Sequence, residues 1–68
     1  MKLVIANSRP EALIYIRRAG LKDVKILTTE FELDLFSLSQ HNVHIVYPIK
    51  RAMLNRIRVQ EVRRALYR

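Results

Sequence analysis

Residues 3–11 carry the stretch LVIANSRPE, which decides the fold. Its first four residues are a continuous apolar run rich in branched side chains, which is typical of a strand buried on both faces of a parallel sheet. Ser8, Pro10 and Glu11 follow as a helix start, because serine can cap free amides, proline fits the first turn and glutamate completes a capping box. A strand that passes directly into a helix is the repeating unit of an α/β protein.

The helix that begins here is predicted to run to about Arg18 and to end at Gly20. A glycine followed by a hydrophobic residue, Leu21, is a common helix stop, in which glycine takes the left-handed conformation. Leu13 and Ile16 are expected to face the core together with Ala12.

Two more apolar runs predict strands at 24–28 and at 43–47, the second ended by Pro48. Between them, residues 30–39 show two competing periods. Phe31, Leu35 and Leu38 recur at helical spacing, although Phe31, Leu33 and Leu35 also alternate as in a strand. Because Thr29 and Glu32 have the spacing of a capping box, we expect a helix there.

Residues 49–67 contain no glycine and are rich in arginine, alanine and leucine, which favours a helix. The chain thus reads as strand and helix three times. We expect a single α/β domain over 1–68, a small (βα)₃ unit with a three-stranded, mainly parallel sheet flanked by helices, the last one long and basic. A near-neutral body over 1–48 precedes the basic C-terminal helix of 49–68.

Positive charge is concentrated in residues 50–68. Seven of the chain's 13 lysine and arginine side chains lie there against one acid, Glu61, so this segment holds six of the seven net charges. Clustered arginine and lysine side chains are the electrostatic footprint of an anionic partner.

These features predict a small non-enzymatic protein that contacts the phosphate backbone of DNA or RNA. The expected contacts are the cations of the last segment, namely Lys50, Arg51, Arg56, Arg58, Arg63, Arg64 and Arg68. Among them, Arg56, Arg63 and Arg64 are expected to be the main contacts, with Tyr67 available to stack on an unpaired base. The alternative is a protein-binding module, an inhibitor or adaptor, that docks its basic helix on an acidic partner.

The apolar residues of the last segment change face along the helix. Ile49, Met53 and Ile57 define one face, whereas Val59, Val62 and Leu66 define another. We therefore expect the first set to pack on the body and the second to form a homo-oligomer interface. Self-association suits so short a chain, because a small domain buries a thin core.

Other functional classes have weaker support. The chain has no cysteine, which excludes disulfides and fits a reducing, cytoplasmic location, and its longest N-terminal apolar run is too short for a leader or membrane span. Glycine-rich phosphate loops and nucleophile motifs are missing, so no cofactor or enzyme activity is predicted.

His41 and His44, the first expected in solvent, are too few for a zinc site, so no metal is predicted. The carboxylates of Glu30, Glu32 and Asp34 are expected to stabilise a helix start or to dock the basic helix of another copy.

Overall fold

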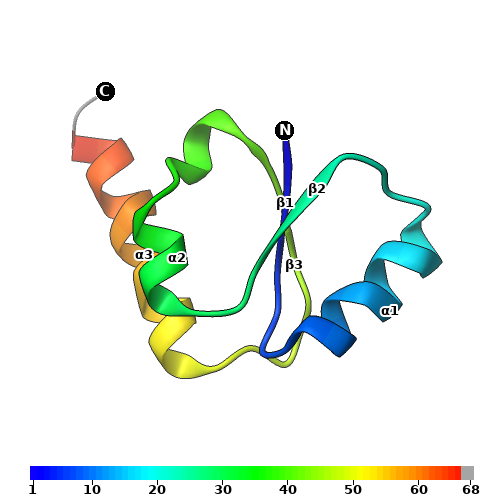
Figure 1. Cartoon of the computed structure of the whole chain (residues 1–68). Helices are drawn as coiled ribbons and strands as arrows, with labels where there is room; N and C mark the ends of the chain where they lie inside the picture. The colour runs from blue at the N-terminus through cyan, green and yellow to red at the C-terminus, as the bar shows by residue number, and fades with distance from the viewer. Residues whose placement is uncertain (67–68) are drawn as a thin grey trace.

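The first strand of the chain is the centre of a three-stranded sheet (Figure 1). The computed structural model describes the backbone of residues 1–66 and the side chains of residues 1–63. The elements are β1 (Lys2–Ile5), α1 (Arg9–Ala19), β2 (Val24–Leu27), α2 (Glu30–Asp34), the 3₁₀ helix η1 (Leu38–Gln40), β3 (Asn42–Ile45) and α3 (Arg51–Leu66). Both β2 and β3 pair with β1 in parallel, in the order β2–β1–β3. The predicted small α/β fold, with strands and helices in alternation and a helix at its end, is confirmed.

Helix α1 covers one face of the sheet, and α2 and α3 cover the other (Figure 1). Successive side chains of a strand point to opposite faces. Leu3 and Ile5 therefore pack with Leu33 of α2, while Val4 packs with Ala12 of α1. All of these side chains are fully buried, so β1 forms part of both core layers.

The ends of α1 follow from local sequence. Ser8 has the extended backbone of an N-cap, but its side chain makes no capping hydrogen bond, so the predicted capping box is not formed. At the other end Gly20 is left-handed, with φ of 65°, and the Leu21 amide donates to the Ile16 carbonyl at 3.1 Å. This pair forms the predicted helix stop, in which a left-handed residue lets the chain turn back on the last carbonyls.

Fewer residues of α1 face the sheet than the sequence predicts. Ala12 is buried and Tyr15 and Ile16 pack beside it, in agreement with helical spacing. Leu13, however, is 40 % exposed and Ile14 is 54 % exposed, so the prediction that Leu13 faces the core is wrong. A residue next to Ala12 is rotated by about 100° around the helix, which turns it away from the sheet.

Residues 30–38 form a shorter helix than predicted. Helix α2 ends at Asp34, and Ser37 is extended before η1 begins, instead of one helix over 30–39. Phe36 and Leu38 both pack on the core. On a straight helix a step of two positions is a rotation of about 200°, which places these side chains on nearly opposite sides, so the chain must unwind between them for both to be buried.

Strand β3 is also shifted, to Asn42–Ile45 from the predicted 43–47. The Val46 amide still donates to the Ile5 carbonyl at 2.8 Å, so the chain leaves β1 only at Tyr47. Since the strands are parallel, α1, α2 and α3 all begin at the edge of the sheet where the strands end.

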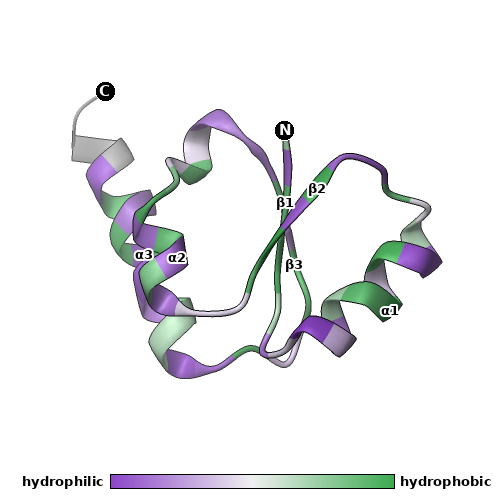
Figure 2. Cartoon of the chain, viewed as in Figure 1, coloured by the Kyte–Doolittle hydropathy of each residue, from purple (hydrophilic) through white to green (hydrophobic). Residues whose placement is uncertain are grey.

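Helix α3 mixes hydrophilic and hydrophobic residues along its described length (Figure 2). Met53 and Ile57, one helical turn apart, are 2 % and 5 % exposed and anchor the helix on the sheet. In the described part of the chain, no helix is long and apolar enough to cross a membrane.

Candidate nucleic-acid interface

Two arginines share the outward face of α3. Arg51 and Arg58 are both exposed, and seven residues of helix bring their side chains to within about 20° of each other around the axis, roughly 10 Å apart along it. They line a shallow pocket of about 520 Å³ together with Ile49, Leu54 and Asn55. Among the described side chains, no carboxylate lies within ion-pair distance of either guanidinium. Both charges are therefore available to an external anion.

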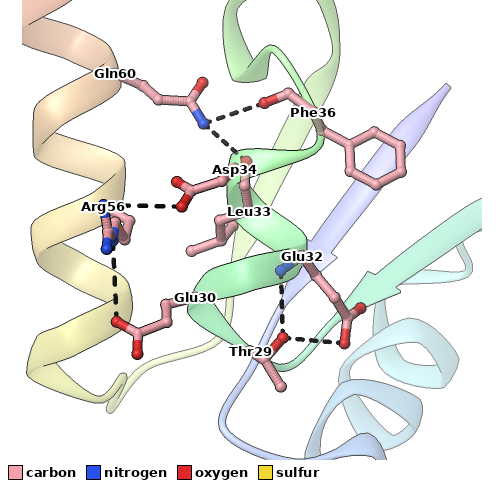
Figure 3. A network of polar contacts seen from close by, with 8 residues as sticks. All are labelled: Thr29, Glu30, Glu32, Leu33, Asp34, Phe36, Arg56 and Gln60. Atoms are coloured by element: carbon pink, nitrogen blue, oxygen red, sulfur yellow. Dashed lines mark hydrogen bonds and ion pairs between the residues drawn. The ribbon is translucent and has the colours of Figure 1, made fainter.

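Arg56 takes a different position from these two. Its Nε lies 3.9 Å from Glu30 Oε2, and its Nη1 lies 3.7 Å from Asp34 Oδ2 (Figure 3). The two carboxylates, four residues apart on α2, flank one guanidinium and offset its charge. Arg56 was expected to be a main phosphate contact, but the structure turns it toward α2 and away from Arg51 and Arg58.

The acidic side chains of α2 are used within the chain. Glu32 points away from Glu30 and Asp34, and its amide donates to Thr29 Oγ1 at 3.2 Å while the Thr29 hydroxyl donates to Glu32 Oε1 at 3.3 Å (Figure 3). The predicted N-cap bond of Thr29 is therefore present, but the Glu32 carboxylate accepts from the Thr29 hydroxyl and not from the Thr29 amide that a full capping box requires. Glu30 and Glu32 lie in the first turn of α2, where a helix start favours carboxylates, and Glu30 and Asp34 contact Arg56 of the same chain. Docking of these carboxylates on another copy stays a prediction.

The remaining predicted cations are dispersed. Arg63 is exposed on the same side of α3 as Arg56, and it borders a groove of about 890 Å³ with Asp34, Leu35 and Val59. Lys50 is exposed just before the helix begins. The side chains of Arg64, Leu66, Tyr67 and Arg68 lie outside the described residues.

Gln60 is a residue that the sequence analysis did not single out. Its Nε2 donates to the carbonyls of Leu33 at 2.9 Å and Phe36 at 3.1 Å, and its Oε1 accepts from the Leu38 amide at 2.9 Å (Figure 3). One side chain thus binds both the end of α2 and the start of η1. The signal was present, because Gln60 follows Met53 and Ile57 at the i, i+4, i+7 spacing of the inward face.

Asn7 holds the chain where it enters α3. In a sheet of order β2–β1–β3, the connections after β1 and β3 leave to opposite faces, and such a switch point is where α/β sheets commonly bind ligands. Here Asn7 Nδ2 donates to the Pro48 carbonyl at 2.9 Å, and Asn7 Oδ1 accepts from the Lys50 amide at 2.7 Å. The Asn7 side chain therefore links the end of β1 to the segment after β3 and fixes the loop that leads to Arg51.

The two histidines occupy separate positions on the body. His44 Nδ1 lies 3.0 Å from the Tyr15 hydroxyl on the α1 face of the sheet. His41, expected in solvent, is partly buried. Its ring lies edge-on to the ring of Phe36, with 5.9 Å between the two ring centroids. Within the described residues, no three potential metal ligands come together.

Comparisons of the chain with protein-family models, with curated proteins and with solved structures found no match. A small α/β fold by itself hosts many unrelated functions. The charge and exposure of α3 are therefore the features of this chain that bear on its function.

Proposed function

We propose that this protein is a small non-enzymatic nucleic-acid-binding protein that contacts the phosphate backbone through α3. The observation that carries the proposal is the pair Arg51 and Arg58, exposed on one stripe with no described carboxylate within ion-pair distance of either. Lys50 and Arg63 add charge on either side of this stripe. Arg64 and Arg68 remain proposed contacts from the sequence alone, whereas Arg56 contributes less because α2 offsets its charge.

The geometry of the pair suits phosphates. Guanidinium groups donate two parallel hydrogen bonds to phosphate oxygens, and each contact releases condensed counterions, which makes the affinity sensitive to salt. Asn55 lies between Arg51 and Arg58 in the same pocket and adds an uncharged donor. Because phosphate contacts carry no base information, binding is expected to be largely independent of sequence.

Replacing Arg51 and Arg58 together by glutamine tests the proposal. We expect nucleic-acid affinity at low salt to fall about tenfold or more, and the slope of log K against log salt to flatten by roughly 1.4 to 1.8, since two phosphate contacts are lost. Fluorescence anisotropy with labelled oligonucleotides at several salt concentrations measures both quantities.

The matched control replaces Arg17 and Arg18 by glutamine. These arginines are also exposed, but they lie on α1, across the sheet from α3. The control removes the same net charge from a different surface. Nucleic-acid affinity should therefore change little if α3 is the interface. Equal losses in the two double variants, or none in either, would contradict the proposal.

A second candidate function is protein docking, and the exposed valines of α3 favour it. Val59 is 41 % exposed and Val62 is 58 % exposed, beside the Arg51–Arg58 stripe. Apolar anchors within a charged rim are the usual make-up of a protein interface. This function predicts a saturable one-to-one complex with an acidic protein and little affinity for bulk nucleic acid.

The same valines are the proposed contact for homodimerisation, with Leu66 added from the sequence. Replacing Val59 and Val62 by glutamine is expected to raise the dimer dissociation constant about tenfold or more, since apolar anchors dominate interface energies. Sedimentation velocity over a range of protein concentrations measures this constant. Glutamine at Leu13 and Ile14, which are similarly exposed on α1, is the matched control. A dimer weakened equally by both pairs would place the interface elsewhere.

A further inference from the structure

Tyr47 is an exposed aromatic residue at the entrance to the basic helix. Its side chain is 68 % exposed where the chain leaves the sheet after β3. Ile45 packs on the α2–α3 side and Val46 on the α1 side. Tyr47 follows in the bend between the end of β3 and the start of α3, so the exposed ring precedes Lys50 and Arg51 by only a few residues.

The loop that carries Tyr47 is anchored in place. Asn7 binds the Pro48 carbonyl and the Lys50 amide, directly after the tyrosine. Ile49, two residues on, packs against the core and also lines the pocket of Arg51 and Arg58. The exposed ring therefore stands on a backbone held by Asn7, two residues before Ile49 of that pocket.

The distances suit a short stretch of nucleic acid. Tyr47 and Arg51 are four residues apart, which limits their separation to at most about 14 Å, and Arg58 lies roughly 10 Å further along the helix axis. A strand a few nucleotides long can reach all three side chains. The order along this path is an aromatic ring, then a cation, then a second cation.

The other described aromatics do not share these surroundings. Phe31 is 72 % exposed, but it lies between Glu30 and Glu32, whose charges repel phosphate. Tyr15 is bonded to His44, and Phe36 packs on the core. Tyr47 is thus the described aromatic that joins exposure to positive charge.

An exposed aromatic ring beside cations favours binding of single-stranded nucleic acid over binding of a duplex. A duplex holds its base faces in its own stack, whereas a single strand offers them to aromatic side chains. We infer that the nucleic acid bound by this protein is single-stranded, with one base stacked on Tyr47 and the adjacent phosphates held by Arg51 and Arg58. This inference rests on the proposed function, which supplies the phosphate contacts.

The test uses two labelled probes, a 15-nucleotide oligothymidylate and a 15-base-pair duplex, with the full chain. The Tyr47→Ala variant is expected to bind the single strand about 5- to 100-fold more weakly, the range measured for loss of one stacking platform, with duplex binding changed less than twofold. Tyr47→Phe keeps the ring and should retain the affinity within about twofold. Phe31→Ala is the control for removal of an exposed aromatic elsewhere. Unchanged circular dichroism spectra would confirm that the variants fold.

The outcomes separate this inference from the proposed function. If Tyr47→Ala binds the oligothymidylate as tightly as the wild type while the Arg51/Arg58 variant has lost affinity, the protein still binds phosphates and the stacking role of Tyr47 is wrong. Tighter binding of the duplex than of the single strand by the wild type would also overturn it. If the wild type binds neither probe at low salt, the proposed function itself fails.

Discussion

Leu33→Ala is expected to lower the free energy of unfolding by about 3 kcal/mol, within the 2–5 kcal/mol range found when a buried leucine is truncated. Leu33 is fully buried in the cluster that contains Leu3, Ile5 and Leu27 of the sheet and Met53 of α3. It is also the buried residue of α2, a helix of five residues. So short a helix has little stability of its own, because most helical stability in proteins comes from packing. The truncation leaves a cavity and also weakens the attachment of α2.

The loss is large for a chain of this size. Domains are stable by roughly 0.05–0.15 kcal/mol per residue, which gives about 3–10 kcal/mol for this protein. Leu33→Ala is therefore expected to remove about a third or more of the free energy of unfolding. Urea denaturation followed by far-UV circular dichroism measures the change in the free energy of unfolding.

Leu35→Ala is the matched control. Leu35 is two residues away, at the C-cap of the same helix, and is 80 % exposed. The same chemical change there should alter the free energy of unfolding by less than about 0.5 kcal/mol. A similar loss in both variants would mean that α2 contacts the sheet through a different face.

The elements that could be predicted from sequence are those set by their own residues. The first strand follows from an unbroken apolar run, which a parallel sheet buried on both faces requires. The stop of α1 at Gly20 follows from the left-handed conformation that glycine adopts without strain. Both signals act within a few residues, so neither depends on where the rest of the chain lies.

The elements that differed from prediction depend on tertiary packing. Residues 30–38 contain two compatible periods, and the choice between a long helix and a turn is made by the burial of both Phe36 and Leu38. Leu13 illustrates the same point on α1, since its exposure depends on how much sheet one helix can cover. No local pattern contains that information.

For the candidate site, the sequence predicted which segment carries the positive charge but not which of its side chains are exposed and unpaired. The excess of positive charge in residues 50–68 is visible in sequence, but its division between the exposed Arg51 and Arg58 and the paired Arg56 requires the position of α2. Tyr47 was assigned to the third strand, and its exposure depends on where the chain leaves β1. Charge could therefore be counted from sequence, whereas its availability could not.

Gln60→Met is expected to lower the free energy of unfolding by about 1–3 kcal/mol, the cost of leaving buried polar groups without partners. Methionine has a similar length and a similar helix propensity, so the change removes the hydrogen bonds and largely keeps the packing. The bonds lost are those to the Leu33 and Phe36 carbonyls and to the Leu38 amide, all part-buried. The Leu33 carbonyl also accepts from the Phe36 amide at 3.3 Å, so the groups that depend on Gln60 are the Phe36 carbonyl and the Leu38 amide, between α2 and η1.

Two comparisons make the Gln60 result specific. Gln40→Met applies the same change to an exposed glutamine of η1 and should alter the free energy of unfolding by less than about 0.5 kcal/mol. Gln60→Glu keeps an acceptor for the Leu38 amide but places a carboxylate oxygen against two carbonyl oxygens, so it should destabilise at least as much as methionine. If glutamate were tolerated at neutral pH while methionine was not, the essential bond would be the one to Leu38, and the two carbonyls would be satisfied without Gln60. If methionine cost nothing in a urea titration, the side chain of Gln60 would not hold α2 on α3, and the attachment of α2 would rest on the burial of Leu33 and the ion pairs of Arg56.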